Sequence, residues 1–219
     1  SAVQTKHNTT FQCEEGHCPV VPVTILVPGS GSELPEVTAP QQWDVFPSPS
    51  GPWNVEWRDV GTNTFDNQIR PVVANLELHE GVLGPAFEGD QYAELDTDWG
   101  GPNDPGQGEP ASVRIYQDIP TVIGKNYEIH YKFSPRPNTP ASENSLEVGW
   151  GGNVVETIPP TAGGGAIAWV EHVVNVVATT TTTRISFTDL GTSNSTGTFL
   201  DDIRVYTESC GQPIISNDI

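Results

Sequence analysis

The sequence predicts an all-β fold, an antiparallel β-sandwich, and three observations support this. Apolar runs are short and rich in Val, Ile, Thr and Tyr, which favour strands. Gly and Pro, at 22 and 20 residues, interrupt nearly every one of these runs. No segment has a helical period of usable length, so no helices are expected to connect parallel strands. The 219 residues are enough for one large domain with a hydrophobic core.

Ten segments with this composition are expected to form strands, each bounded by turn residues. They cover residues 53–57, 75–79, 91–96, 112–118, 126–134, 145–150, 153–158, 168–177, 182–188 and 198–206. The threonine run at 179–183 follows a Val-rich segment, and its β-branched residues favour a strand and its turn.

The first 42 residues differ from the rest in having many prolines, a Gly-Ser-Gly-Ser run and no apolar period. We interpret them as a tail or linker with one possible strand at 20–27. The predicted domain limits are therefore 1–42 for this tail, 43–209 for the β domain and 210–219 for a C-terminal tail. The chain contains no Met, which suggests a processed protein or part of a larger one.

Alternation assigns side chains in three of these strands to opposite faces. In 75–79 the leucines oppose Glu77 and His79, and in 91–96 the pair Ala93 and Leu95 opposes Glu94. Segment 145–150 repeats the pattern with Glu147. Each strand thus presents a Glu on a face away from the core. An ordinary solvated sheet face is an equally good interpretation.

The closing strand carries two adjacent acids, Asp201 and Asp202, between apolar residues. Regular alternation places Asp201 on the same face as Phe199, Ile203 and Val205, and so predicts that it is buried. A buried carboxylate needs a partner, and a hard cation such as calcium is one candidate. The alternative is an edge strand whose acids point to water.

The charge of the chain favours the calcium interpretation. It has 28 acidic and 9 basic residues, a net charge of −19, which excludes nucleic acid and anionic membranes as expected partners. No apolar stretch is long enough to insert in a membrane. Acids also gather in a loop rich in Gly and Pro, and turn formation does not explain them: Asp90, Glu94, Asp96, Asp98 and Asp104. Loop oxygens are the ligands that calcium uses, although no EF-hand pattern is present.

The three cysteines, Cys13, Cys18 and Cys210, predict one disulfide and one further thiol. The termini of a sandwich commonly lie close together, so a bridge from Cys13 or Cys18 to Cys210 is plausible. A small Cys13–Cys18 loop is the alternative. Zinc binding by these two cysteines with His17 lacks a visible fourth ligand.

Arg136 and three tryptophans are the candidate ligand contacts. Arg136 lies between two prolines, which stiffen the backbone and pre-organise the guanidinium for a carboxylate or vicinal hydroxyls. A salt bridge to Glu143 or Glu147 is an equally good explanation. Trp57 and Trp150 are expected in the core, whereas Trp99 is expected to be exposed for stacking on a sugar.

Catalytic motifs are absent from the sequence. It contains no nucleophile elbow, no His-Glu-x-x-His and no phosphate-binding loop. Glu77, Glu94 and Glu147 are potential carboxylates for glycoside hydrolysis, but pairs of acids are unavoidable in so acidic a chain. We therefore expect a protein that is not an enzyme.

Several motifs, in this order, resemble those of a known domain family. They are LELH at 76–79, GDQYAELD at 89–96, IYQD at 115–118, FSPRP at 133–137, EVGWGG at 147–152 and FLDDI at 199–203. Together they resemble the galactose-binding-like jelly rolls of the DUF642 type, which are bacterial and plant extracellular modules. They are also similar to carbohydrate-binding modules and to ligand-binding modules of calcium-dependent bacterial adhesins. The family's opening Asn-Gly-Ser-Phe-Glu stretch is absent.

This resemblance implies a jelly roll that is secreted or on the cell surface and binds an extracellular glycan without catalysis. It further implies Ca²⁺ as a structural or bridging ion. A module that binds peptide or protein in cell adhesion is the first alternative, and a structural domain of a secreted multidomain protein is the second. The expected ligand contacts are Arg136, Trp99, Glu94, Asp96 and Glu147, and the expected calcium ligands are Asp201, Asp202, Asp90 and Asp96.

Overall fold

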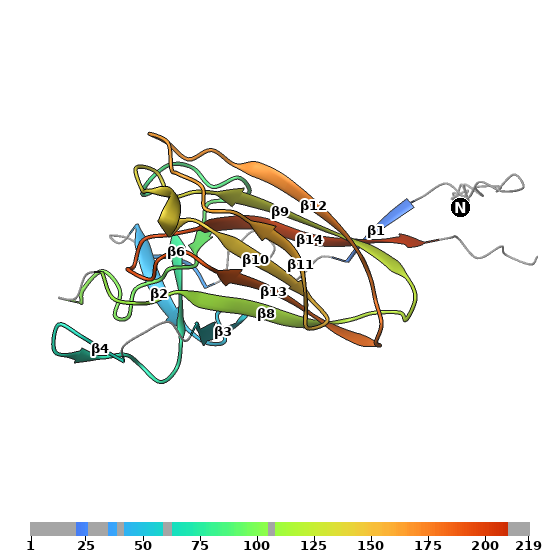
Figure 1. Cartoon of the computed structure of the whole chain (residues 1–219), viewed down its shortest axis with the longest axis horizontal. Helices are drawn as coiled ribbons and strands as arrows, with labels where there is room; N and C mark the ends of the chain where they lie inside the picture. The colour runs from blue at the N-terminus through green and yellow to red at the C-terminus, as the bar shows by residue number, and fades with distance from the viewer. Residues whose placement is uncertain (1–20, 26–34, 39–41, 59–62, 105–107, 210–219) are drawn as a thin grey trace, which may run out of the picture.

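The computed structural model describes residues 21–25, 35–38, 42–58, 63–104 and 108–209. Within them the chain forms fourteen strands and one short 3₁₀ helix, Ala141–Glu143. Most of the strands belong to two antiparallel sheets that pack face to face as a sandwich (Figure 1). The predicted all-β antiparallel sandwich is therefore confirmed.

The first sheet has seven strands and contains the closing strand near its centre. Its order is β12 (Val170–Val177), β9 (Asn126–Ser134), β14 (Phe199–Ser209), β7 (Tyr92–Glu94), β6 (Asn75–His79) and β2 (Trp43–Pro47). The seventh strand, β1 (Val21–Ile25), pairs with the C-terminal part of β14. The pairs of β7 with β14 involve only the first two residues of β14.

The second sheet has five strands, and a small hairpin lies apart from both sheets. The order is β11 (Asn153–Ile158), β10 (Leu146–Trp150), β13 (Thr182–Asp189), β8 (Val113–Pro120) and β3 (Asn54–Trp57). The hairpin pairs β4 (Thr64–Phe65) with β5 (Gln68–Ile69). Each of the ten predicted segments contains a strand, whereas β2, β4 and β5 were not predicted.

The hydrophobic core fills the space between the sheets and follows the predicted alternation. Leu76, Leu78 and Ala93 face inward and are buried with Ile115 and Phe187 of the opposite sheet. Burying side chains of this size stabilises the fold by about 1.5–3 kcal/mol each. The residues between them, among them Glu77 and Glu94, lie on the outer face of the seven-stranded sheet, turned away from the five-stranded one.

The tryptophans follow the core prediction in two of three cases. Trp150 is buried in the core, and Trp57 is partly buried against it. Trp99, expected to be exposed, is only 3% exposed, and its indole nitrogen donates to the carbonyl of Pro110 at 3.3 Å. The exposure prediction for Trp99 was wrong because its loop folds back onto the protein instead of projecting into water.

A bulge in β14 changes the predicted arrangement of the closing strand. The pairing with β9 shifts register between Asp201 and Arg204, and Asp202 has φ +47°. Phe199 therefore lies on the outer face, in contact with the ring of His79, while Ile203 belongs to the core. Asp201 is buried as predicted, but it does not share a face with Ile203.

Two segments of the stretch predicted as a tail belong to the sandwich. β1 lies within the possible strand at 20–27, and Val37 is buried in the core, with its N–H donating to Gln91 Oε1 at 2.6 Å. The domain limits stay a prediction. Cys13, Cys18, Cys210 and His17 lie outside the described residues.

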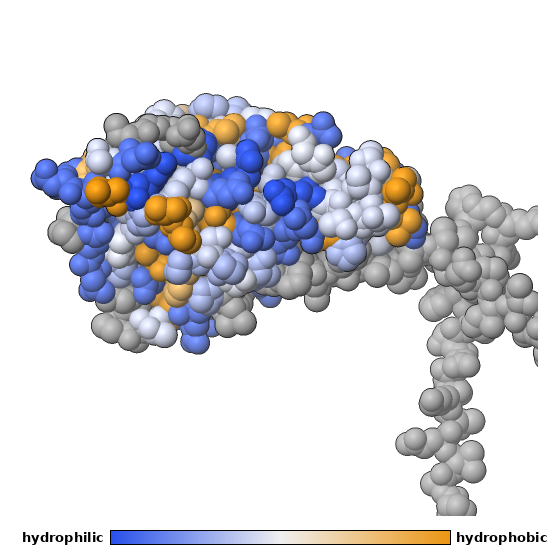
Figure 2. Space-filling view, turned by 90° about the horizontal axis from the view of Figure 1, so that it is seen from below, coloured by the Kyte–Doolittle hydropathy of each residue, from blue (hydrophilic) through white to orange (hydrophobic). Residues whose placement is uncertain are grey.

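The surface of the described residues is mainly hydrophilic. Figure 2 shows one face on which apolar residues gather only in small separate groups. The most exposed apolar side chains among the described residues are Val72, at 98%, just after the β4–β5 hairpin, and Ile69, at 77%, in β5 itself. No helix among the described residues is long and apolar enough to cross a membrane.

Candidate functional site

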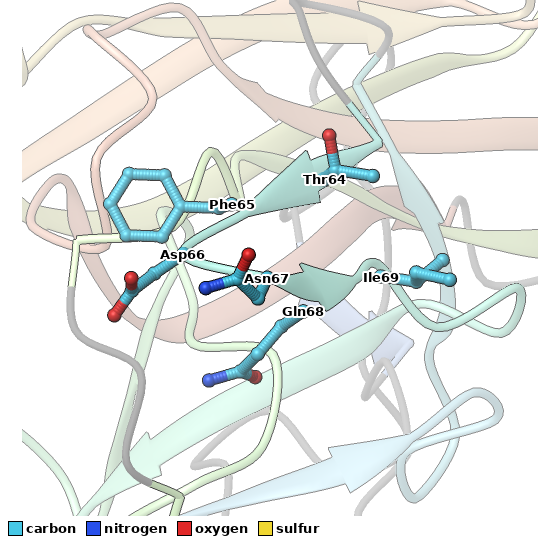
Figure 3. Close-up of a pocket in the computed structure, with 6 residues that line it drawn as sticks. All are labelled: Thr64, Phe65, Asp66, Asn67, Gln68 and Ile69. Atoms are coloured by element: carbon cyan, nitrogen blue, oxygen red, sulfur yellow. The ribbon is translucent and has the colours of Figure 1, made fainter.

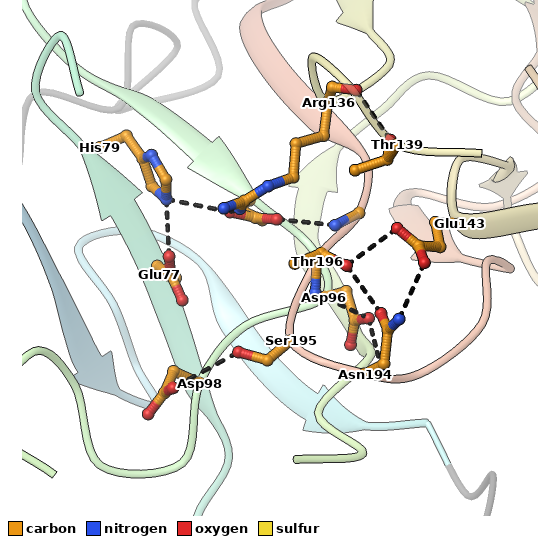
Figure 4. A network of polar contacts seen from close by, with 12 residues as sticks. Glu77, His79, Asp96, Asp98, Arg136, Thr139, Glu143, Asn194, Ser195 and Thr196 are labelled. Atoms are coloured by element: carbon orange, nitrogen blue, oxygen red, sulfur yellow. Dashed lines mark hydrogen bonds and ion pairs between the residues drawn. The ribbon is translucent and has the colours of Figure 1, made fainter. Parts of the chain in front are cut away.

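Four charged side chains meet on the outer face of the seven-stranded sheet, and we call them the sheet cluster: Glu77, His79, Glu94 and Arg136. Strand pairing places Glu77 directly opposite Glu94. His79 Nε2 lies 2.6 Å from Glu77 Oε1 and 3.0 Å from Glu94 Oε2. Arg136 Nη1 donates to Glu94 Oε2, and Figure 4 shows the Arg136 side chain extending toward His79. Two carboxylates and two basic groups therefore face one another.

The electrostatics of the sheet cluster follow from its burial. Glu77, His79 and Glu94 are each less than 5% exposed. Burial raises the pKa of Glu77 to about 7, although its hydrogen bond to His79 opposes this. Burial alone would lower the pKa of His79, but the hydrogen bonds to Glu77 and Glu94 outweigh it and raise the pKa to about 9. His79 is thus cationic at neutral pH and helps Arg136 to balance the acids.

Loops cover this part of the outer face, which is why it is dry. Trp169 packs edge-on against Tyr92 at 5.5 Å between centroids, and its indole nitrogen donates to Pro85 O at 3.1 Å. Phe199 lies below Arg136, whose guanidinium carbon is 5.9 Å from the ring centroid. The expectation of Glu side chains on a face away from the core is therefore correct for β6 and β7, but that face is not solvated.

Three acids at alternate positions contact the segment that precedes β14. Glu94 Oε1 accepts from Gly197 N at 2.7 Å, and Asp96 Oδ2 accepts from Asn194 N at 2.7 Å. Asp98 Oδ2 lies 3.4 Å from Ser195 Oγ. Several of the loop acids that turn formation does not explain therefore accept hydrogen bonds from the backbone and a hydroxyl of another loop.

Asp96, predicted for both ligand and metal, lies in a buried network of its own. Its Oδ1 accepts from Ser112 Oγ at 3.2 Å, and the same hydroxyl lies 2.7 Å from Asp189 Oδ2. Burial, and then the nearby charge of Asp189, raise the pKa of Asp96 well above its usual value. Asp96 is 0% exposed, and the Ser112 hydroxyl connects it to Asp189 at the end of β13.

The predicted ligand contacts are only partly brought together. Arg136 and Glu94 touch, so the partner of Arg136 is Glu94, and the predicted partners Glu143 and Glu147 are incorrect. Glu147 is half-buried on β10, in the other sheet, where it pairs across to Thr157 and Thr188. Alternation identified a face for each Glu, but it did not indicate which strands share a sheet.

The predicted calcium ligands do not form a group. Asp201 Oδ2 accepts from the backbone N–H of Phe87 at 2.7 Å and of Glu88 at 3.2 Å, and Oδ1 accepts from Asp202 N at 2.7 Å. Asp202 Oδ1 accepts from Arg204 Nε at 2.5 Å. Asp90 is exposed. Burial raises the pKa of Asp201 to about 7 despite these amide donors.

A second group of acids, which we call the loop cluster, lies in the loop after β7. It consists of Asp98, Asp104 and Glu109, whose carboxylate oxygens lie within 4.8 Å of one another. The sequence had singled out Asp98 and Asp104 as part of an acidic loop. Glu109 was missed because it follows the Asp90–Asp104 stretch, and no local pattern indicates that the loop returns to Asp98.

The β4–β5 hairpin borders a shallow, open hollow of about 280 Å³, lined by Thr64 to Ile69 (Figure 3). Asp66 and Asn67 form its two-residue turn, with φ of +42° and +64°. Its lining comes from this one hairpin, and the volume is at the lower end of ligand pockets. The sheet cluster and the loop cluster are therefore the stronger candidates.

The comparisons with known proteins show a shared fold. No family model matches this sequence, and no curated protein does, so membership of the DUF642 type stays a prediction. The structure is similar to the Stig cyclase Fisc from Fischerella sp. TAU, with 14% identity, a TM-score of 0.55, and coverage of 87% of this chain and 100% of that one. The structure is also similar to an apo cyclase from Fischerella sp., with 16% identity and a TM-score of 0.51. The match covers 87% of this chain and 98% of the cyclase. Identity this low establishes fold, not activity.

A carbohydrate-binding module is also similar over part of the chain. The family 35 module from Clostridium thermocellum has 14% identity and a TM-score of 0.37. The match covers 58% of this chain and 88% of the module. A score at this level does not bear on function. The function has to be inferred from the two clusters themselves.

Proposed function

We propose that this domain is a non-catalytic extracellular module that binds carbohydrate, with Arg136 in contact with the ligand and calcium as a structural or bridging ion. The observation that carries the proposal is the state of Arg136. Its side chain is 22% exposed, and only Nη1 of the guanidinium has an acceptor among the described residues. The remaining N–H groups are available to hydroxyls or to a carboxylate.

The backbone around Arg136 is fixed before any ligand arrives. The Arg136 N–H donates to Asn144 Oδ1 at 2.8 Å, and Thr139 Oγ1 donates to the Arg136 carbonyl at 2.7 Å. Pro135 and Pro137 restrict the chain on both sides. A guanidinium held in this way loses little entropy on binding, which favours affinity for the paired oxygens of a sugar.

The carboxylates of the sheet cluster support binding and not hydrolysis. A general acid or a nucleophile must reach the substrate, and a glycosidase needs two such carboxyl groups. Glu77 and Glu94 are buried, and both lie against His79, while Glu94 also binds Arg136. These two carboxylates therefore position Arg136 and do not act on a substrate.

The leading alternative ligand is a peptide. A guanidinium recognises a peptide carboxylate as well as a uronic acid, because both present two coplanar oxygens. A domain without a ligand, acting as a structural part of a larger secreted protein, is the remaining alternative. The experiment below separates these three functions.

The experiment is a glycan array and a peptide array, each probed in calcium and in EDTA. Arg136→Lys keeps the charge opposite Glu94 but lacks the planar fork, so we expect glycan binding to weaken at least tenfold. The matched control is Arg184→Lys, because Arg184 also pairs with a carboxylate, Asp118 at 2.7 Å, and also lies over an aromatic ring. This control should bind like the wild type.

Three results would count against the proposal. Binding to peptides alone would assign the domain to peptide recognition. Silence on both arrays would favour a structural domain. Equal affinity of Arg136→Lys and wild type for a captured glycan would place the ligand elsewhere on the surface.

A further inference from the structure

The loop cluster differs from the other acid groups in having a buried carboxylate that accepts no hydrogen bond from another described residue. Glu109 is 0% exposed, and neither of its side-chain oxygens accepts from an amide, hydroxyl or basic group of another residue in the described part of the chain. An ionised carboxylate buried without a partner strongly destabilises the folded state, because its charge loses the solvation of water. Glu109 therefore requires either a proton or a cation.

The protein provides no cation for Glu109 in the part of the chain that the structure describes. No basic side chain there forms a salt bridge with Glu109 or Asp98. Burial raises the pKa of Glu109 to about 7 although its own backbone N–H opposes this, and the nearby charges of Asp98 and Asp104 act in the same direction as burial. The three carboxylates thus repel one another unless a positive ion or protons intervene.

The backbone holds the three carboxylates in this position. Asp98 Oδ1 accepts from Gly100 N at 2.8 Å and from Gly101 N at 2.9 Å. Asp104 folds against Gly100 so closely that a Cβ at Gly100 would lie 1.7 Å from Asp104 Oδ2. Gly101, with φ +77°, provides the turn. The glycines therefore allow Asp104 to reach Asp98 and Glu109.

The spacing of the oxygens suits a calcium ion. Ca²⁺ binds oxygen ligands at about 2.3–2.6 Å, so two ligands of one ion lie at most about 5 Å apart. The oxygens of the loop cluster lie within 4.8 Å. The group contains no nitrogen or sulfur ligand, which disfavours zinc and other transition metals. Asp104 is only partly buried and Gly100 is exposed, so the site has access to solvent.

We propose that Asp98, Asp104 and Glu109 bind one Ca²⁺ ion, which fixes the loop between β7 and β8. The ion stabilises a loop that contacts the segment before β14, because Asp98 Oδ2 lies 3.4 Å from Ser195 Oγ. This assignment deepens the calcium part of the proposed function and does not depend on which ligand the module binds.

The test is calcium titration of the full chain after removal of metal with a chelator. Isothermal titration calorimetry measures the affinity, and Tb³⁺ luminescence sensitised by Trp99, next to Asp98, reports the location. Glu109→Gln and Asp104→Asn should each weaken calcium binding at least tenfold. Two controls, Asp118→Asn and Glu128→Gln, replace exposed acids outside both clusters and should bind calcium like the wild type. Asp202→Asn tests the site predicted from the sequence, and we expect it to keep the affinity.

The thermal midpoint distinguishes loss of binding from loss of folding. In EDTA, Glu109→Gln should melt at or above the wild-type temperature, because the neutral amide removes the repulsion among three acids. In calcium the order should reverse. Wild-type calcium affinity in both Glu109→Gln and Asp104→Asn would overturn the assignment, as would a wild-type protein that takes up no calcium. A silent glycan array would leave it intact.

Discussion

The sheet cluster and the loop cluster solve the same electrostatic problem in opposite ways. Both gather buried carboxylates near β7. In the sheet cluster, His79 and Arg136 balance Glu77 and Glu94 within the protein. In the loop cluster, no basic side chain among the described residues forms a salt bridge with Asp98 or Glu109. The difference teaches that a cluster of buried carboxylates needs an external cation only where the fold does not place a basic side chain beside it.

The strongest way to break this comparison is to remove the central acid of the sheet cluster. Glu94→Ala leaves protonated His79 and Arg136 facing each other without that carboxylate, and Gly197 N loses its acceptor. Breaking a buried pair in this way costs about 3–5 kcal/mol of unfolding free energy. Urea denaturation measures it.

The control for Glu94→Ala is an exposed pair of the same kind. Asp118→Ala removes the partner of Arg184, and both side chains are almost half exposed. Exposed pairs contribute about 0.2–1 kcal/mol. A similar loss in both variants would mean that the sheet cluster contributes no more than a surface ion pair.

Calcium should stabilise the protein through the loop cluster alone. At a free concentration of 100 times the dissociation constant, an ion that binds only the folded state adds about 2.7 kcal/mol. We expect Glu94→Ala to gain as much from calcium as the wild type, because the two clusters share no ligand. Differential scanning calorimetry with and without EDTA measures both gains, and a loss of the gain in Glu94→Ala would show that the clusters are coupled.

Gly100→Ala sharpens the comparison on the loop side. The added methyl would collide with the Asp104 carboxylate, so Asp104 must move away from Asp98 and Glu109. We expect calcium affinity to fall about tenfold, which corresponds to about 1.4 kcal/mol. Gly165→Ala, where a Cβ meets nothing within 4 Å, is the control and should retain the affinity.

When EDTA removes calcium, the pH dependence of the unfolding free energy should show the contribution of the sheet cluster. The pKa of His79 rises from 6.5 to about 9 on folding, so its contribution is complete below pH 6.5 and is lost as the pH approaches 9. The raised pKa of Glu77 acts in the same direction between pH 4.5 and 7. Each proton released lowers the unfolding free energy by at most about 1.4 kcal/mol per pH unit.

His79→Gln separates this contribution from that of other acids. The variant should show a shallower decline in stability between pH 6.5 and 9 than the wild type. Urea unfolding at several pH values gives the two slopes. Stability that rises with pH in this range would contradict a protonated His79 between the two carboxylates.

Local pattern accounts for much of what the sequence predicted correctly. Short β-branched runs between Gly and Pro determine the strands, because a pleated, half-buried backbone suits these residues. Alternation then determined that Glu77 and Glu94 point away from the core. These properties depend only on neighbours along the chain.

The tertiary structure alone decided which groups meet. Glu94 lies beside Glu77 but far from Glu147 in the order of strands, because β7 pairs with β6 while β10 belongs to the other sheet. A bulge at Asp202 moved Phe199 and Ile203 to opposite faces, and loop return buried Trp99 and brought Glu109 to Asp98. Strand pairing and loop closure join residues distant in sequence, so the cations that neutralise each acid follow from the fold and not from local pattern.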